Sequence, residues 1–172
     1  CSWPLRMPNG MSISEIAEVA DEFGLKTYPR IHVGVGFCLY IKRSVIEKMG
    51  LLEEHAYGKF YTEENDFCLR AGRRGYIHVL ADDTFIFHKE EASMREASID
   101  IASVKNRNER ILIKRYPEYV QLQHDFFQSR PLDPLRKRLD FFLHRKMAHK
   151  RPKIMYVLHS SITKNIIGGT EF

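Results

Sequence analysis

The stretch YTEENDFCLRAGRRGYIHVL, residues 61–80, places three carboxylates within four positions, directly before an apolar run. Thr62 is a residue type that often caps the start of a helix, and Gly72 and Gly75 are residue types that often end one. We therefore predict a helix over 62–75 that begins with a dense negative charge.

The three carboxylates Glu63, Glu64 and Asp66 fall in the first turn of this predicted helix, and two interpretations of them are open. Negative charge at a helix start is favoured by the helix dipole, by about 0.3–1 kcal/mol per charge. Asp66 can also pair with Arg70 one turn further on. Alternatively, a helix start at the rim of a sheet aims a carboxylate into a cleft, where it accepts a proton from a substrate hydroxyl.

Apolar spacing and turn residues predict alternating helices and strands for the rest of the chain. The helix expected nearest the start has Ser12 or Ser14 as its cap and Gly24 at its end, and Ser44 is expected to cap the next one. A turn is expected at Asp82 and Asp83. The predicted ranges are helices over 12–24, 44–50, 93–120 (stopped before Pro117) and 133–150, strands over 31–43 and on both sides of the turn within 76–90, and a loop over 51–60.

This order predicts an α/β fold in three parts. Residues 1–92 form a compact unit, and 93–150 form a helical, basic connector. Residues 151–172 begin a further α/β domain, because KIMYVLH is a continuous apolar run of the kind found in buried parallel strands. The chain also lacks an initiator Met, so we expect it to be a piece of a longer protein.

The composition excludes several classes of protein. No apolar run approaches the roughly 20 residues of a membrane span. Three cysteines without a CxxC pair argue against a disulfide framework and a structural zinc site, and they suit the cytoplasm. Cys38 and Cys68 are expected to be small buried residues.

The positive charge is concentrated in residues 136–153, which hold eight Lys/Arg and one Asp, a local charge of +7. Since the whole chain has a net charge of +5, the remainder carries −2. Three interpretations stay open: a solvated linker helix, peripheral contact of 135–150 with an anionic membrane at the inner face, and nucleic-acid binding. The last is the weakest and is not expected, because no recognition motif accompanies the charge.

The run over 33–93 resembles the C-terminal half of family 2 glycosyltransferases, inverting enzymes of the GT-A fold with a Rossmann-like sheet. The shared features, in order, are Gly34 and Gly36 leading to Arg43, Gly50 to Glu53, the acidic helix Glu63-Glu64-Asn65-Asp66-Phe67 with Arg70, Gly75-Tyr76, and His88. The resemblance covers roughly 60 residues.

The resemblance implies roles for individual residues. Glu64 matches the catalytic base, although the family more often has Asp there. Glu63 and Asp66 would orient the site, and His88 would help to bind a divalent metal. Gly34, Gly36 and Trp3 would lie at the substrate; packing or a surface contact would explain these three equally well. Sugar transfer from a nucleotide-sugar to a glycan or lipid-linked acceptor, with inversion, is then expected in bacterial surface polysaccharide synthesis, by a hexosyl- or rhamnosyl-type transferase.

The family's nucleotide-binding half lies upstream of the matched run. That half carries the carboxylate pair that supplies the main ligands of the Mg²⁺ or Mn²⁺ ion. Nothing before Ile31 in this chain supplies such a pair. We therefore expect the isolated chain to be inactive. The competing hypothesis is a non-catalytic domain of the same fold that acts as a scaffold or linker between two transferase modules. The end of the chain, KIMYVLHSSITKNIIGGTEF (153–172), resembles the opening strand and glycine loop of a family 4, GT-B glycosyltransferase.

Overall fold

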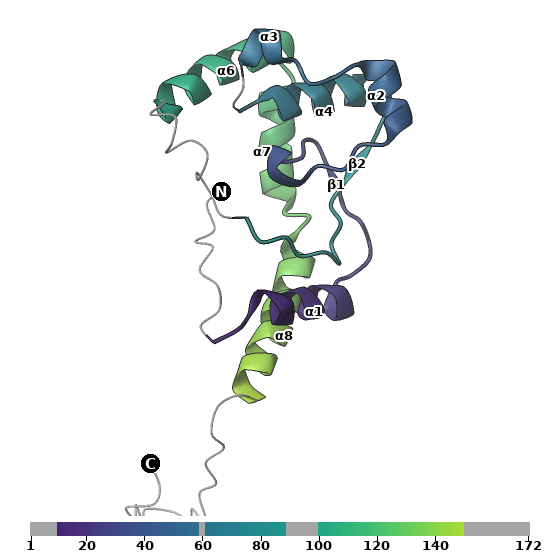
Figure 1. Ribbon diagram of the computed structural model, residues 1–172, viewed down its shortest axis with the longest axis vertical. Coiled ribbons are helices and arrows are strands. Elements are labelled where there is room, and N and C mark those ends of the chain that lie inside the picture. Colours follow the sequence, from purple (N-terminus) through teal and green to yellow (C-terminus); the bar gives the residue numbers. More distant parts are fainter. Residues whose placement is uncertain (1–9, 59–60, 89–99, 150–172) are drawn as a thin grey trace, which may run out of the picture.

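The computed structural model describes residues 10–58, 61–88 and 100–149, which form a mostly helical structure with one small sheet (Figure 1). Trp3 and residues 151–172 lie outside the described residues. The elements are α1 (Ile13–Phe23), β1 (Arg30–Ile31), the 3-10 helix η1 (Gly36–Cys38), α2 (Arg43–Met49), α3 (Glu54–Tyr57), α4 (Glu63–Arg73), β2 (His78–Val79), α6 (Ile101–Arg115), α7 (Tyr119–Ser129) and α8 (Asp133–His149).

The expected mixture of helix and strand is present, but its balance differs from the prediction. β1 and β2 pair antiparallel, with Arg30 opposite Val79 and Ile31 opposite His78. Within the described residues this pair is the whole sheet, and no Rossmann-like sheet appears among them. The family's larger sheet therefore stays a prediction.

Four predicted helices, over 12–24, 44–50, 62–75 and 133–150, are confirmed as α1, α2, α4 and α8. α1 begins at a capping box in which the Ser12 hydroxyl accepts from the Glu15 N–H while the Glu15 carboxylate accepts from the Ser12 N–H. α4 follows Thr62, which occupies the cap position without the expected side-chain hydrogen bond. α8 has the length expected for the segment before residue 150.

The strand predicted over 31–43 is wrong. Only Arg30 and Ile31 are paired, after which the chain bends into η1 and enters α2 at Arg43. The Gly34 N–H donates to the Cys68 sulfur, 3.4 Å away, and not to the carbonyl of a neighbouring strand. The β-branched and aromatic residues over 32–43 therefore form no strand, because no described strand lies beside them to pair with.

Four smaller expectations are also corrected. Ser44 lies inside α2, and Lys42 occupies the cap position without a side-chain bond. The loop over 51–60 contains α3, and residues 84–88 form no strand. α7 was not predicted as a separate helix; α6 ends before Pro117 as expected, and the chain then starts again.

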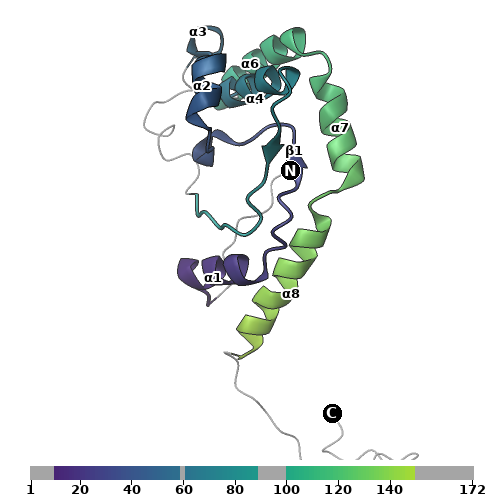
Figure 2. The same ribbon diagram turned by 90° about the vertical axis from the view of Figure 1, so that its right-hand side faces the viewer.

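The two ends of the described chain pack together at the lower end of the molecule, where α1 lies against α8 (Figures 1 and 2). Phe23 stacks on Phe142 with ring centroids 3.6 Å apart. One apolar face of α8 covers this contact, since Leu139, Phe142, Leu143 and Met147 pack against Met11, Ile16 and Val19. This face of α8 is therefore half-buried against the cluster that includes α1.

Two further clusters form the core around α4. One joins α3, α4 and α6 and the other joins α2 and α4. The buried members are Tyr57, Leu69, Leu112 and Tyr116 in the first cluster and Met49, Phe67 and Ala71 in the second. α4 therefore lies between helices on two sides, with α7 and α8 continuing as a column below (Figure 2).

A tight backbone contact joins the end of α1 to the turn at Asp82 and Asp83. A Cβ atom on Gly24 would lie 2.5 Å from the Asp82 carbonyl oxygen and 2.7 Å from the Asp83 Cα. The buried Asp82 carboxylate holds the same region by accepting from the Thr27 N–H at 3.1 Å and the Thr27 hydroxyl at 3.0 Å. Only a glycine fits between these two segments.

Replacing Gly24 by Ala is therefore expected to lower the free energy of unfolding by about 1–3 kcal/mol, because the methyl group meets fixed backbone atoms. Gly72→Ala is the matched control, since its Cβ meets nothing within 4 Å in the last turn of α4. That variant should gain about 0.5–1 kcal/mol. Urea denaturation of both variants checks this, and equal effects of the two substitutions would refute the close contact.

Candidate functional site

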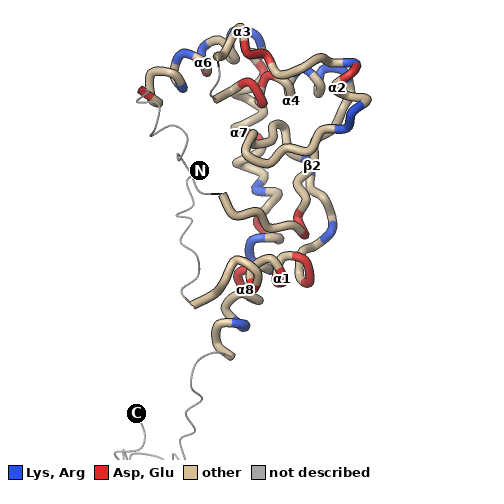
Figure 3. The backbone as a smooth tube through the Cα atoms, viewed as in Figure 1, with Lys and Arg blue, Asp and Glu red and all other residues tan. Residues whose placement is uncertain are grey.

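The first turn of α4 separates its three carboxylates into three environments. Asp66 is 2% exposed and points into the protein, whereas Glu63 and Glu64 are half-buried. Acidic residues gather where α3 and the start of α4 meet (Figure 3). The helix start is therefore the acidic end of the described fold, and its members have different partners.

Asp66 is the centre of a buried polar network. Its Oδ1 accepts from the hydroxyls of Tyr57 and Tyr116 and from the Arg115 guanidinium, each at 3.1 Å. Its Oδ2 lies 3.6 Å from the Arg70 Nε. These partners come from α3, from α4 itself and from the end of α6, so one carboxylate ties three helices together. It points into the protein and holds the helix.

The hydroxyls of this network are kept neutral by their surroundings. Burial, followed by the charge of Asp66, raises the pKa of Tyr116 to about 12. The same two causes raise the pKa of Tyr57 well above its ordinary value. Both tyrosines therefore remain hydrogen-bond donors to Asp66 throughout the physiological pH range.

The backbone before α4 is held in an unusual conformation by α6. Tyr61 and Thr62 both have left-handed φ angles, +63° and +89°, which is uncommon for a β-branched residue such as Thr. Asn108 of α6 is fully buried and donates its side-chain amide to the carbonyls of Tyr57 and Tyr61, at 2.9 and 2.8 Å. α6 thus fixes the angle at which the chain enters α4.

Glu64 lies against the bend of the chain at η1. Its Oε2 accepts from the Thr62 N–H at 3.1 Å. A Cβ atom on Gly36 would lie 3.5 Å from the Glu64 carboxyl carbon, so the backbone of residue 36 and this side chain are in contact range. Two residues predicted for the site, Glu64 and Gly36, are therefore neighbours in space.

Gly34 and His88 lie around the same bend. The Gly34 N–H donates to the buried Cys68 sulfur on α4, while Cys38, which was expected to be buried, is exposed. The His88 ring stacks on Phe37 of η1, with centroids 4.4 Å apart and planes at 15°. The bend thus places Gly36 beside Glu64, Gly34 beside Cys68 in the middle of α4, and His88 beside Phe37.

The described residues contain no group of three His, Cys, Asp or Glu side chains arranged to hold a metal. The one contact recorded for His88 is the stack on Phe37. Its role as a metal ligand stays a prediction, with the other ligands expected from the upstream half.

Glu63 carries a carboxyl oxygen that is buried and has no hydrogen-bond partner among the described residues. Burial, with a smaller contribution from the charge of Glu64, raises the pKa of the Glu63 carboxyl above its ordinary range. The Glu63 carboxyl therefore holds its proton to a higher pH than an exposed glutamate does.

The supporting residues on α6 were not identified from the sequence. Asn108, Leu112, Arg115 and Tyr116 recur at i, i+4, i+7 and i+8, which is one face of a helix. The one sequence signal for this face is that polar residues stand among apolar ones along the same side of the helix. The segment was predicted to be a connector outside the first unit, so its contact with α4 was not expected.

No protein-family model, no curated protein and no solved structure matches this chain. The described residues also include no helix long and apolar enough to cross a membrane. The functional assignment therefore depends on the geometry at the start of α4 and on the family resemblance of the sequence.

Replacing Glu63 by Gln is expected to raise the melting temperature at neutral pH. Because burial raises the folded-state pKa of Glu63, the charged carboxylate opposes folding above that pKa and the penalty disappears at low pH. The gain should shrink to nothing below about pH 4, where the carboxyl is protonated in both states. Thermal melts across this range, with exposed Glu22→Gln on α1 as control, measure it; a gain independent of pH would contradict the burial argument.

Proposed function

We propose that this chain is the catalytic and acceptor-binding half of an inverting glycosyltransferase, with Glu64 as the base. The observation that carries the proposal is the division of the acidic helix start. Asp66 is enclosed by four side chains, whereas the half-buried Glu64 lies beside the glycine bend at Gly36. Of the two, only Glu64 is placed to meet a ligand.

The chemistry proposed for Glu64 is a single proton transfer coupled to displacement. The carboxylate accepts the proton of an acceptor hydroxyl. The resulting oxygen attacks the anomeric carbon of the donor sugar from the face opposite the leaving nucleotide diphosphate, whose bond to that carbon breaks, so the configuration inverts. Positioning of the two substrates supplies much of the remaining rate enhancement. Gly36 contributes by leaving space beside the carboxylate.

Glu63 is assigned a supporting role next to Glu64 in this proposal. Its carboxylate can accept a hydrogen bond from a hydroxyl group that enters the site. Its buried, unpartnered oxygen is the structural support for this role.

The small sheet and its exposed apolar residues fit the proposal that an upstream half completes the fold. Large apolar side chains are exposed on the segments next to β1, β2 and η1: Val35, Phe37, Tyr40, Ile77, Val79, Ile86 and Phe87. Such residues on neighbouring segments are typical of a surface that another part of a protein covers. The proposal therefore assigns the Rossmann-like sheet and the nucleotide site to that upstream half.

The metal has a limited place in this proposal. A divalent cation would neutralise charge on the leaving diphosphate. His88 is the one predicted ligand among the described residues, and no step is assigned to it. The predicted activity of the isolated chain is accordingly negligible, and the test uses the protein with its upstream half restored.

Glu64→Gln in that longer protein is expected to lower the rate of nucleotide release from a sugar nucleotide by about 10²–10⁴-fold, the usual contribution of a general base. The assay uses a panel of sugar nucleotides with Mn²⁺ and a lipid-extract acceptor. Donor affinity should be unchanged, because the amide keeps the size of the side chain. Glu54→Gln, an exposed change on α3, is the control.

Full activity in Glu64→Gln would remove Glu64 from the chemistry. The acidic turn would then be a helix start stabilised by the dipole, and the non-catalytic scaffold would be the better description. Loss of donor binding together with activity would likewise contradict the assignment of Glu64 as a base.

A further inference from the structure

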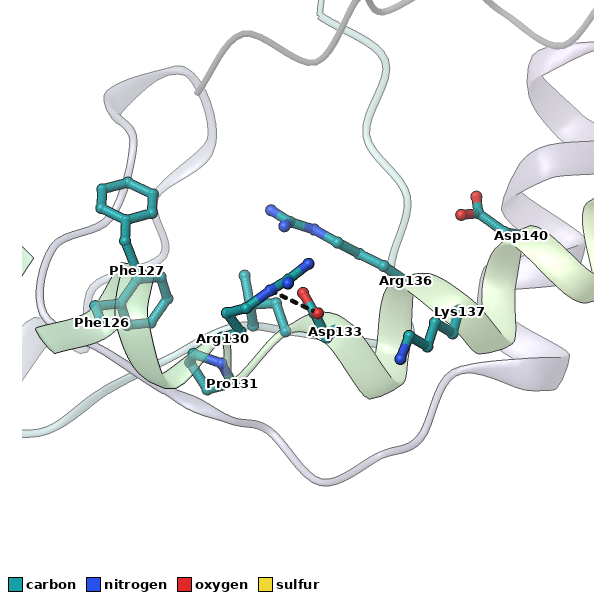
Figure 4. Close-up of a pocket in the computed structure, with 9 residues that line it drawn as sticks. Phe126, Phe127, Arg130, Pro131, Asp133, Arg136, Lys137 and Asp140 are labelled. Carbon is teal, nitrogen blue, oxygen red and sulfur yellow. Dashed lines mark ion pairs between the residues drawn. The ribbon is translucent and has the colours of Figure 1, made fainter. Parts of the chain in front are cut away.

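A groove lies at the corner where α7 ends and α8 begins, away from the acidic helix start (Figure 4). Its volume is about 410 Å³. This volume falls within the range of about 300–1,000 Å³ that is usual for small-molecule sites. The groove is independent of the proposed transferase site and shares no lining residue with it.

The corner has a defined local structure. α7 ends at Arg130, whose backbone is left-handed (φ +48°) and whose N–H donates to the Phe126 carbonyl. Pro131 follows, and the Arg130 guanidinium pairs with Asp133 at 2.8 Å, in the first turn of α8. This turn sets the aromatic end of α7 beside the basic start of α8.

One wall of the groove is aromatic. Phe126 is held edge-on against His32 at 5.8 Å and against Phe127 at 6.0 Å. Phe127 itself is 53% exposed, although it is a large apolar side chain. An apolar or aromatic group that entered the groove would cover a ring that now faces water, which is favourable.

The opposite wall is cationic. Arg136 and Lys137 line it from the first two turns of α8, and Arg136 extends into the space that Arg130 also enters (Figure 4). Asp133 is already paired with Arg130, which leaves Asp140 as the other acidic residue of the lining. The N-terminal end of the α8 dipole adds positive potential at the same place.

We propose that this groove binds a phosphate ester that carries an apolar or aromatic group. Arg136 and Lys137 would bind the phosphate, since guanidinium and ammonium groups are the usual phosphate partners in proteins. The apolar part would lie on Phe126 and Phe127. A nucleotide and a phospholipid headgroup share this chemistry, so the test separates the two sources.

Binding of a phospholipid headgroup in this groove would differ from insertion of α8 into a membrane. The apolar face of α8 is occupied by α1, through the Phe23–Phe142 stack and the cluster around it. A lipid would therefore be held by its headgroup at the corner, with the helix itself remaining on the protein.

The test measures how tightly the full chain binds three probes. They are inorganic phosphate, adenosine monophosphate, and phosphatidylcholine vesicles with or without phosphatidic acid. Calorimetry serves for the first two and co-sedimentation for the vesicles. The double variant Arg136→Gln/Lys137→Gln should bind about tenfold more weakly than the native chain, as expected for the loss of charge-assisted bonds. The matched control is Arg110→Gln/Lys114→Gln, two exposed cations one turn apart on α6.

Phe127→Ala tests the aromatic wall separately from the cationic wall, and it changes an exposed residue. It should weaken binding of the nucleotide or of phosphatidic acid and leave inorganic phosphate unaffected. Binding of the nucleotide alone identifies a soluble ligand, and binding of phosphatidic acid alone identifies a lipid. The proposal is overturned if neither binds, or if the α6 variant loses as much affinity as the α8 variant, which would show diffuse charge attraction.

Discussion

A buried carboxylate with four partners is the constraint on which the arrangement of the upper helices depends. Removing the charge of Asp66 from water is costly, and the cost is offset only while the hydroxyls and guanidinium groups around it keep their positions. Because those groups come from α3, α4 and the end of α6, the three helices have one mutual arrangement that satisfies the charge. Apolar packing around Tyr57, Leu69 and Leu112 then adds to the same arrangement.

This constraint explains how an acidic helix start can both fix the helix, through Asp66, and present another carboxylate, Glu64, at the chain bend. Asp66, in the first turn of α4, faces the core and fixes the helix, while Asn108 fixes the strained entry at Tyr61 and Thr62. The remaining side chains of that turn are then presented in a fixed direction. Glu64 beside Gly36 is the result, and the proposed role of Glu64 as a base depends on a carboxylate that is held in this way.

The sequence predicted those features whose causes are local. The helix that begins after Ser12, the helix that ends before residue 150 and the helix over Glu63–Arg73 follow from spacing and turn chemistry within one element. The strand over 31–43 failed because strands need partners, and the Gly34 N–H found Cys68. The roles of Asn108 and Tyr116 depend on contacts about 50 positions away in the chain, which no local pattern encodes.

The most direct test of this account is a double-mutant cycle between Asp66→Ala and Tyr116→Phe, followed by urea denaturation. Asp66→Ala leaves the Tyr116 hydroxyl buried without its acceptor, and Tyr116→Phe removes one of the four partners of Asp66, so the double variant should be more stable than the sum of the single effects by about 1–3 kcal/mol. The same cycle with exposed Asp125→Ala in place of Asp66→Ala should be additive. Additive effects of Asp66→Ala and Tyr116→Phe would show that the hydroxyl and the carboxylate do not hold α4 and α6 together.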